Sequence, residues 1–193
     1  EWFGRKLGLK HGSGGVAASG GSLSNLMALV IARHNAGLEN DPSAVFFASD
    51  DSHVSLLKAV RIMGLNQDAL QKIPTDEEGK LNTKSLYSTI NRVHSENRKC
   101  FGVVATAGTT VRGAIDPISE IAKFCQKENL WLHVDGAIGG AFGLSELTSN
   151  LIKGTSLANS ITVNPQKLLG IAKASSLLLV SEKSILSSVF STG

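Results

Sequence analysis

The sequence is short of cysteine, of excess charge of either sign and of long apolar runs. Its two cysteines, Cys100 and Cys125, form no disulfide framework and lack the paired spacing of a metal site. Both lie among apolar residues, so we expect buried free thiols and a reducing compartment, with the cytoplasm as the default. No apolar run reaches the ~18 residues that span a membrane, and the N-terminus shows no signal-peptide pattern.

Charge and composition predict a packed globular protein. The net charge is +3, from 19 basic and 16 acidic residues, and short basic pairs such as Arg98-Lys99 are scattered. This pattern favours a solvated, slightly basic surface over a nucleic-acid surface. With 193 residues, 42% of them hydrophobic, the chain is long enough for one domain with a sizeable core and too short for two full domains.

Short apolar runs alternate with longer amphipathic stretches, which predicts a three-layer α/β/α domain with a mostly parallel sheet. We expect strands at 44–48, 69–73, 102–106, 130–134, 160–163 and 176–180, and helices at 24–36, 54–63, 83–95, 118–128 and 182–190. No linker or repeat interrupts the sequence, so residues 1–193 form one predicted domain. Residues 1–7 have the pattern of the tail of a helix and contain no initiator methionine, so we expect a piece of a longer protein.

Two of the expected strands are followed by residues that suit one cofactor. Asp135 follows the strand at 130–134, and Lys167 follows the strand at 160–163. The carboxyl ends of parallel strands meet at one edge of an α/β sheet, where such sheets bind ligands. A lysine amine can bond an aldehyde and a carboxylate can keep a ring nitrogen protonated, so the pair suggests pyridoxal 5'-phosphate (PLP). Taken singly, Lys167 could be a surface charge and Asp135 could be satisfied by nearby backbone amides.

A glycine-rich turn precedes the first long expected helix. Ser19-Gly20-Gly21-Ser22 would let the backbone approach an anion at the helix N-terminus, where unpaired N–H groups point outward. Ser22 could cap the helix or bond a phosphate oxygen. No Gly-Lys-Ser/Thr follows, so this is not a P-loop, and by itself the segment could be only a turn.

Other polar residues also follow expected strands. His53 could stack on a planar ring or move a proton, or it could be a solvated residue of a capping loop. The hydroxyls of Thr106-Ala107-Gly108-Thr109-Thr110 could bond a ligand or only stabilise a turn. Asp116 precedes a proline and a helix, so we expect a helix N-cap. His133 and Asp135 lack the further ligands that a metal site needs.

In their order along the chain, these segments resemble the group II PLP-dependent amino-acid decarboxylases, the family of the glutamate, cysteine-sulfinate and aromatic amino-acid decarboxylases. The resemblance spans almost the whole chain. The matching segments are Ser19-Gly20-Gly21-Ser22 with Asn25-Leu26-Met27-Ala28-Leu29, Ser49-Asp50 with His53, Gly108-Thr109-Thr110 with Gly113, His133-Val134-Asp135-Gly136-Ala137, and Asn164-Pro165-Gln166-Lys167. It implies a fold-type-I large domain whose enzyme decarboxylates an L-amino acid to the amine.

The resemblance also implies the site. Three residues would be catalytic: Lys167 holds PLP covalently, Asp135 partners the ring nitrogen, and His53 stacks on the ring. The substrate amine would displace Lys167, and CO₂ would leave perpendicular to the ring. The other cofactor-binding residues would be Ala137 against the second face of the ring, Thr110 near the cofactor, and Gly21, Ser22 and Asn164 at the phosphate.

The sequence departs from the family at Gln166, where a histidine is usual before the lysine, so any proton-donating role of that side chain is lost. Gly170 after the lysine favours the acidic-substrate branch over the aromatic branch, where a tryptophan often follows the lysine. Family members are longer homodimers, so an N-terminal segment and a small C-terminal domain are expected outside this chain, which could be inactive alone. The alternatives are another fold-type-I enzyme, a lyase or an aminotransferase, or a non-catalytic fragment that retains the fold.

Overall fold

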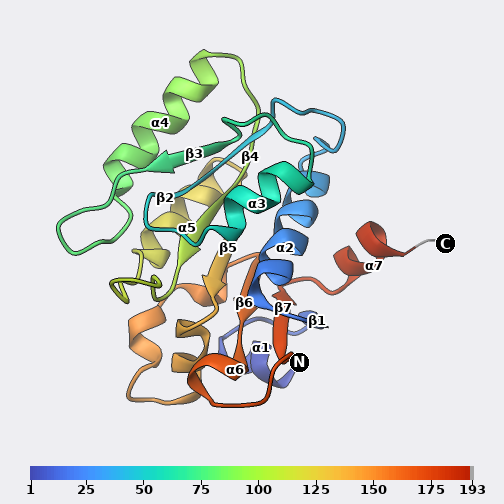
Figure 1. Cartoon of the computed structure of the whole chain (residues 1–193), viewed down its shortest axis with the longest axis vertical. Helices are drawn as coiled ribbons and strands as arrows, with labels where there is room; N and C mark the ends of the chain where they lie inside the picture. The colour runs from blue at the N-terminus through green and yellow to red at the C-terminus, as the bar shows by residue number, and fades with distance from the viewer. Residues whose placement is uncertain (192–193) are drawn as a thin grey trace.

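A computed structural model describes residues 1–191 and shows one seven-stranded sheet between layers of helices (Figure 1). The strand order is β1-β7-β6-β5-β4-β2-β3. The strands are β1 (Gly14–Ala18), β2 (Val45–Ser49), β3 (Leu70–Ile73), β4 (Cys100–Thr106), β5 (Trp131–Gly136), β6 (Ser160–Val163) and β7 (Ser176–Val180). The α-helices are α1 (Trp2–Lys6), α2 (Gly21–Asn35), α3 (Ser55–Ile62), α4 (Thr83–Ser95), α5 (Ile118–Lys127), α6 (Pro165–Leu168) and α7 (Ser184–Phe190). The last two residues of the predicted domain, 192 and 193, lie outside the described part.

The sheet is mixed and mostly parallel, as predicted. Strands β3, β2, β4, β5 and β6 run parallel to one another, whereas β7 pairs antiparallel with both β6 and β1. Every residue of β2, β5 and β6 is buried, which is typical of central strands covered on both faces. The expected fold class, a three-layer α/β domain, is therefore confirmed.

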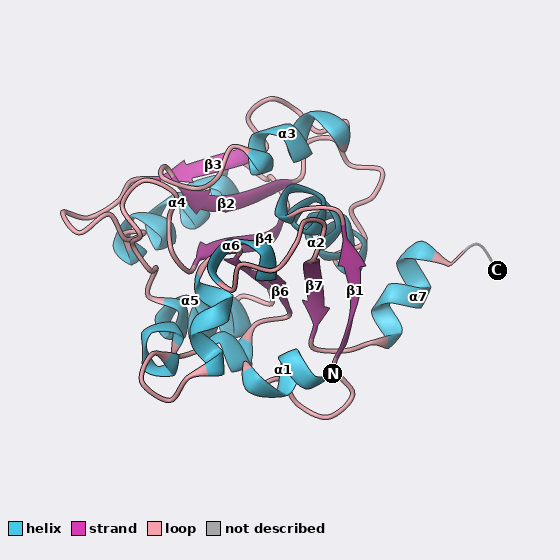
Figure 2. Ribbon diagram, turned by 60° about the horizontal axis from the view of Figure 1, so that its bottom comes forward, coloured by secondary structure: helices cyan, strands magenta, loops and turns pink. Residues whose placement is uncertain are grey.

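Two apolar clusters fill the space between the sheet and its helices, one on each face (Figure 2). One cluster joins α4 and α5 to the sheet, and the other joins α2 and α3 to the opposite face. Strand β5 shows the underlying alternation, because Leu132 and Val134 enter the first cluster while Trp131 enters the second. The face that carries Trp131 also carries His133 and Asp135, which brings these two polar side chains under α2.

Strand β1 is absent from the sequence prediction, because its Gly-Gly-Val-Ala-Ala run has little apolar bulk. The structure also adds α6 and three short 3-10 helices, Gly139–Leu144, Ser149–Ile152 and Thr155–Leu157. No helix within residues 1–191 is long and apolar enough to cross a membrane.

The predicted N-cap role of Asp116 is wrong. Pro117 is the N-cap residue of α5, and no side chain caps the helix. The Asp116 carboxylate instead accepts hydrogen bonds from the backbone N–H groups of Leu81 and Thr106, both at 2.7 Å. Burial raises the pKa of this carboxyl to about 6. Asp116 therefore joins the end of β4 to the segment before α4.

Candidate active site

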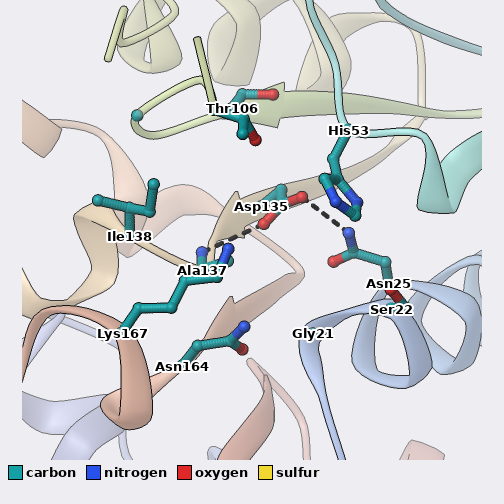
Figure 3. Close-up of a pocket in the computed structure, with 12 residues that line it drawn as sticks. Gly21, Ser22, Asn25, His53, Thr106, Asp135, Ala137, Ile138, Asn164 and Lys167 are labelled. Atoms are coloured by element: carbon teal, nitrogen blue, oxygen red, sulfur yellow. Dashed lines mark hydrogen bonds between the residues drawn. The ribbon is translucent and has the colours of Figure 1, made fainter. Parts of the chain in front are cut away.

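A cavity of about 200 Å³ opens at the carboxyl edge of the parallel strands (Figure 3). All eight residues predicted for the site line it: Gly21, Ser22, His53, Thr110, Asp135, Ala137, Asn164 and Lys167. Four further residues line it for which no specific role was predicted: Asn25, Thr106, Gly108 and Ile138. These residues come from five separate segments of the sequence. They meet because the carboxyl ends of parallel strands lie at one edge of the sheet, which we call the strand-end rule.

Asp135 lies near the end of β5 at the base of the cavity. It pairs in register with Thr106 of β4 and Thr162 of β6, so it stands at the carboxyl edge of three adjacent strands. Its side chain is 6% exposed, and its Oδ1 atom accepts a hydrogen bond of 3.1 Å from the backbone N–H of Ala137. Its Oδ2 atom accepts a shorter bond of 2.7 Å from the side-chain amide of Asn25. These donors suit a carboxylate and fix its orientation.

His53 stands in the loop between β2 and α3, and Figure 3 shows its ring beside Asn25 and Asp135. Its Nδ1 atom accepts a hydrogen bond of 3.2 Å from the backbone N–H of Ser55. An imidazole nitrogen that accepts carries no proton, so in the neutral ring the proton is on Nε2. The ring lines the cavity, while its Nδ1 atom faces the backbone at the start of α3.

Gly21, Ser22 and Asn164 lie together at the N-terminus of α2. The N-cap residue is Gly20, with no side-chain capping bond, so Ser22 does not cap the helix. The first turn of an α-helix presents N–H groups without intrahelical partners, together with partial positive charge. A Cβ atom added at Gly21 would lie 2.6 Å from Nδ2 of Asn164, so only glycine lets the helix start approach this amide so closely.

Lys167 is carried by the short helix α6, which begins at Pro165, one residue beyond the end of β6. Its backbone N–H donates to the carbonyl of Asn164 at 2.9 Å, and its side chain is exposed. Figure 3 shows that side chain running over the cavity toward Ala137 and Asp135. Lys167, the residue predicted to bond the cofactor, and the carboxylate of Asp135 therefore line the same cavity.

The threonines after β4 lie partly in a turn and partly at the cavity. The Thr109 hydroxyl accepts a hydrogen bond of 3.0 Å from the backbone N–H of Ala114 and so stabilises a turn. Thr110 is exposed and lines the cavity. The Thr106 hydroxyl is buried and lines it too, and within residues 1–191 it has no hydrogen-bond partner.

The two ring nitrogens of His133 have protein partners. The side chain is fully buried, and its ring nitrogens lie within hydrogen-bond distance of Ser160 and Asn25. Burial lowers its pKa to about 4 despite the nearby Asp135 carboxylate, so the ring is neutral at neutral pH. Among the described residues, no three His, Cys, Asp or Glu side chains are placed to hold a metal ion.

The residues fit a flat, phosphate-bearing cofactor. Buried polar atoms are nearly always hydrogen-bonded, yet Thr106 Oγ1 and Asn164 Oδ1 are buried at the cavity without a partner in the described part of the chain. The helix N-terminus at Gly21 provides a cradle for an anion at the same end as Asn164. A carboxylate, a lysine amine and an imidazole complete the set that PLP chemistry requires.

Comparisons with known proteins identify relatives of this chain. Residues 2–192 match the pyridoxal-dependent decarboxylase conserved domain. Two curated relatives are each 38% identical over 88% of this chain, the aromatic-L-amino-acid decarboxylase of Bacillus atrophaeus and the human cysteine sulfinic acid decarboxylase. The crystal structure of mouse CSAD in its apo form is 34% identical over the whole chain, covers it with a TM-score of 0.95, and is matched over 42% of its own length. The chain spans 35% and 36% of the two curated relatives.

Proposed function

The chain belongs to the pyridoxal-dependent decarboxylase family, and we propose that it is the PLP-binding core of an enzyme that decarboxylates an L-amino acid to the corresponding amine. The carboxylate of Asp135 and the amine of Lys167 line one cavity, and this observation carries the proposal. The family's cofactor is PLP, and the cavity has the groups that this cofactor needs.

In this proposal each group of the cavity has one task. Lys167 anchors the cofactor through its amine, and Asp135 keeps a proton on the ring nitrogen. His53 and Ala137 contact the two faces of the ring, with Thr110 nearby. Gly21, Ser22 and Asn164 hold the phosphate at the start of α2.

When bound, the cofactor would take up the electrons of the bond that breaks. The residues of this chain would orient the cofactor and hold the protons that the reaction needs. The Asp135 carboxylate, which two donors already fix in place, would face the ring nitrogen of the cofactor and keep it protonated. In His53, Nδ1 accepts a hydrogen bond from the Ser55 backbone, so the Nε2–H group is the one that can donate to a ligand. Gln166 has no acid–base chemistry, so the proton that completes the product comes from another group.

We propose an acidic amino acid as the substrate. The support is Gly170, which stands at the distance from the lysine where the acidic branch has a glycine. Leu168 also stands where the aromatic branch often has tryptophan. The two curated relatives name an aromatic and a sulfinic substrate at equal identity, so a substrate panel must include both classes.

We further propose that the full-length protein is a cytoplasmic homodimer whose N-terminal segment and small C-terminal domain lie outside this chain. Exposed apolar side chains stand on α6 and on loops at the same edge of the sheet as the cavity, which suits a covered surface. They are Val54, Val111, Leu168, Leu169 and Ile171. Burial raises the thiol pKa of Cys100 to about 11 and that of Cys125 to about 12, so both are unreactive free thiols that suit a reducing compartment.

Product analysis tests the proposed reaction. The full-length protein with PLP should release CO₂ from an acidic L-amino acid such as glutamate or cysteine sulfinate, with an amine as the second product. Formation of a keto acid would support an aminotransferase instead. Absence of any PLP-dependent product across acidic and aromatic amino acids would favour a non-catalytic protein that retains the fold.

A further inference from the structure

Asp135 stands at one end of a buried relay of hydrogen bonds that begins at Trp131. The indole Nε1 atom of Trp131 donates to Ser160 Oγ at 2.8 Å, and Ser160 Oγ lies 2.9 Å from Nδ1 of His133. The Nε2 atom of His133 lies 3.1 Å from Oδ1 of Asn25, whose Nδ2 atom donates to Asp135 Oδ2 at 2.7 Å. The relay is therefore continuous from the indole to the cavity.

The relay is sealed from water. Ser160 is fully buried, His133 and Asn25 are each 1% exposed, and even the two ends, Asp135 at 6% and Trp131 at 7%, are buried. The β5 members occupy alternate positions and so share one face of the sheet, where α2 supplies Asn25 and β6 supplies Ser160. Hydrogen bonds in such a dry environment fix orientation strongly, because an unpaired polar group there is destabilising.

The direction of the relay follows from its Asp135 end. A carboxylate can only accept, so the Asn25 amide presents its NH₂ group to Asp135 and its Oδ1 atom to His133. That oxygen can only accept, so Nε2 of His133 carries the proton, and Nδ1 of the neutral ring accepts from the Ser160 hydroxyl. Ser160 Oγ in turn accepts from the indole N–H of Trp131, which can only donate. Burial, which lowers the His133 pKa to about 4, keeps the ring in this neutral form.

We propose that His133 and Asn25 are positioning residues that hold Asp135 as a correctly oriented acceptor for the ring nitrogen of the cofactor. This inference rests on the proposed role of Asp135. Ser55 Oγ takes the second hydrogen of the Asn25 amide at 3.1 Å, so the amide is fixed on three sides. Thr162 Oγ1 lies farther from Nε2 of His133, at 3.4 Å, and adds only a weak contact.

Loss of the imidazole should act on the cofactor through Asn25. Without the Nε2 donor, Oδ1 of Asn25 has no donor in this buried layer, so the amide is no longer held on that side. The bond from Asn25 to Asp135 Oδ2 is then weaker, and the carboxylate is oriented less firmly. A hydrogen bond to a charged group corresponds to about a tenfold change in affinity, so PLP should bind about tenfold more weakly.

The test uses the full-length protein and three substitutions. His133→Phe removes both ring nitrogens, His133→Gln keeps a donor and an acceptor on a side chain of similar reach, and Thr162→Val is the matched control in the same buried layer. The readouts are the dissociation constant for PLP, the position of the visible band of the bound cofactor, and the thermal unfolding of the protein without PLP. In parallel, ¹⁵N NMR of histidine-labelled wild type locates the imidazole proton, with His133 assigned by the signal that His133→Gln lacks.

The proposal predicts that His133→Phe weakens PLP binding about tenfold and moves the visible band, that His133→Gln restores most of both, and that Thr162→Val stays within twofold of wild type. The NMR spectrum should show the proton on Nε2 at neutral pH. A proton on Nδ1, or a folded His133→Phe protein with wild-type affinity and band, would overturn it. Should wild type bind no PLP, the proposed function fails, and the NMR result alone still decides the direction of the relay.

Discussion

The Nε2 atom of Gln166 donates a hydrogen bond to the hydroxyl of Ser176, 2.8 Å away. The other end of the same amide accepts from the Ser175 hydroxyl at 3.0 Å. Gln166 is not among the residues that line the cavity, and its amide joins the Lys167 helix to the start of β7 across an exposed loop. The residue that departs from the family pattern has a structural task here, which explains why it need not supply a proton.

Substitution Gln166→Ala should loosen the helix that carries Lys167. The loss of two hydrogen bonds should lower the free energy of unfolding by about 1–2 kcal/mol and weaken PLP binding several-fold. Ser175→Ala removes one of the two bonds and should give an intermediate effect. Thermal unfolding with and without PLP measures both quantities, and equal stability of Gln166→Ala and wild type would contradict this role.

Substitution Gly21→Ala should block the phosphate end of the cavity. Its Cβ atom would stand 2.6 Å from Nδ2 and 3.0 Å from Oδ1 of Asn164, so the amide must move out of place. We expect about a tenfold loss of affinity for PLP, which a fluorescence titration measures.

The matched control for Gly21→Ala is its neighbour. An added Cβ at Gly20 meets nothing within 4 Å, and its φ of −178° is an extended conformation that any residue adopts. Gly20→Ala should therefore keep wild-type affinity. Equal losses in the two variants would mean that the effect is a general disturbance of the turn and not a block at Asn164.

Asp116 should make the folded protein less stable as the pH rises. Its pKa is raised by burial from 3.8 to about 6, so the folded state binds the proton more tightly than the unfolded state. The stabilisation from this group is complete below pH 4 and is lost as the pH rises through about 6, by ~3 kcal/mol. Unfolding temperatures of wild type and Asp116→Asn between pH 4 and 7 check the sign.

The difference between those two proteins isolates Asp116 from other titrating groups. His133 has the opposite effect, because its lowered pKa of about 4 makes stability rise with pH over the same range in both proteins. The stability of Asp116→Asn relative to wild type should therefore increase from pH 4 to pH 7. Parallel curves would show that Asp116 has an ordinary pKa in the folded state.

Strands whose side chains form a continuous apolar run could be predicted from the sequence. Strands β6 and β7 have the bounds expected from their apolar runs, whereas β1 escaped because glycine and alanine give no such signal. Its partner β7 lies at the other end of the chain, so only the folded sheet brings them together.

The site, like the fold, could be predicted only in part from the sequence. The strand-end rule placed Asp135 and Lys167 in one cavity because the carboxyl ends of parallel strands converge. The role of Asn25 could not be predicted from the sequence, because it lies inside a helix and its partners Asp135 and His133 come from a distant strand. For Asp116 the local sequence pattern predicts a helix cap. In the folded protein its carboxylate instead accepts hydrogen bonds from the backbone of Leu81 and Thr106.

Covalent mapping of the cofactor tests the central claim most directly. PLP added to the full-length protein should give a visible band, and borohydride reduction followed by peptide mapping should place the adduct on Lys167. Lys167→Ala should lack both the band and the adduct, whereas Lys173→Ala, which changes an exposed lysine just beyond Gly170, should keep both. An adduct on another lysine in wild type, or a reducible adduct that persists in Lys167→Ala, would contradict the account.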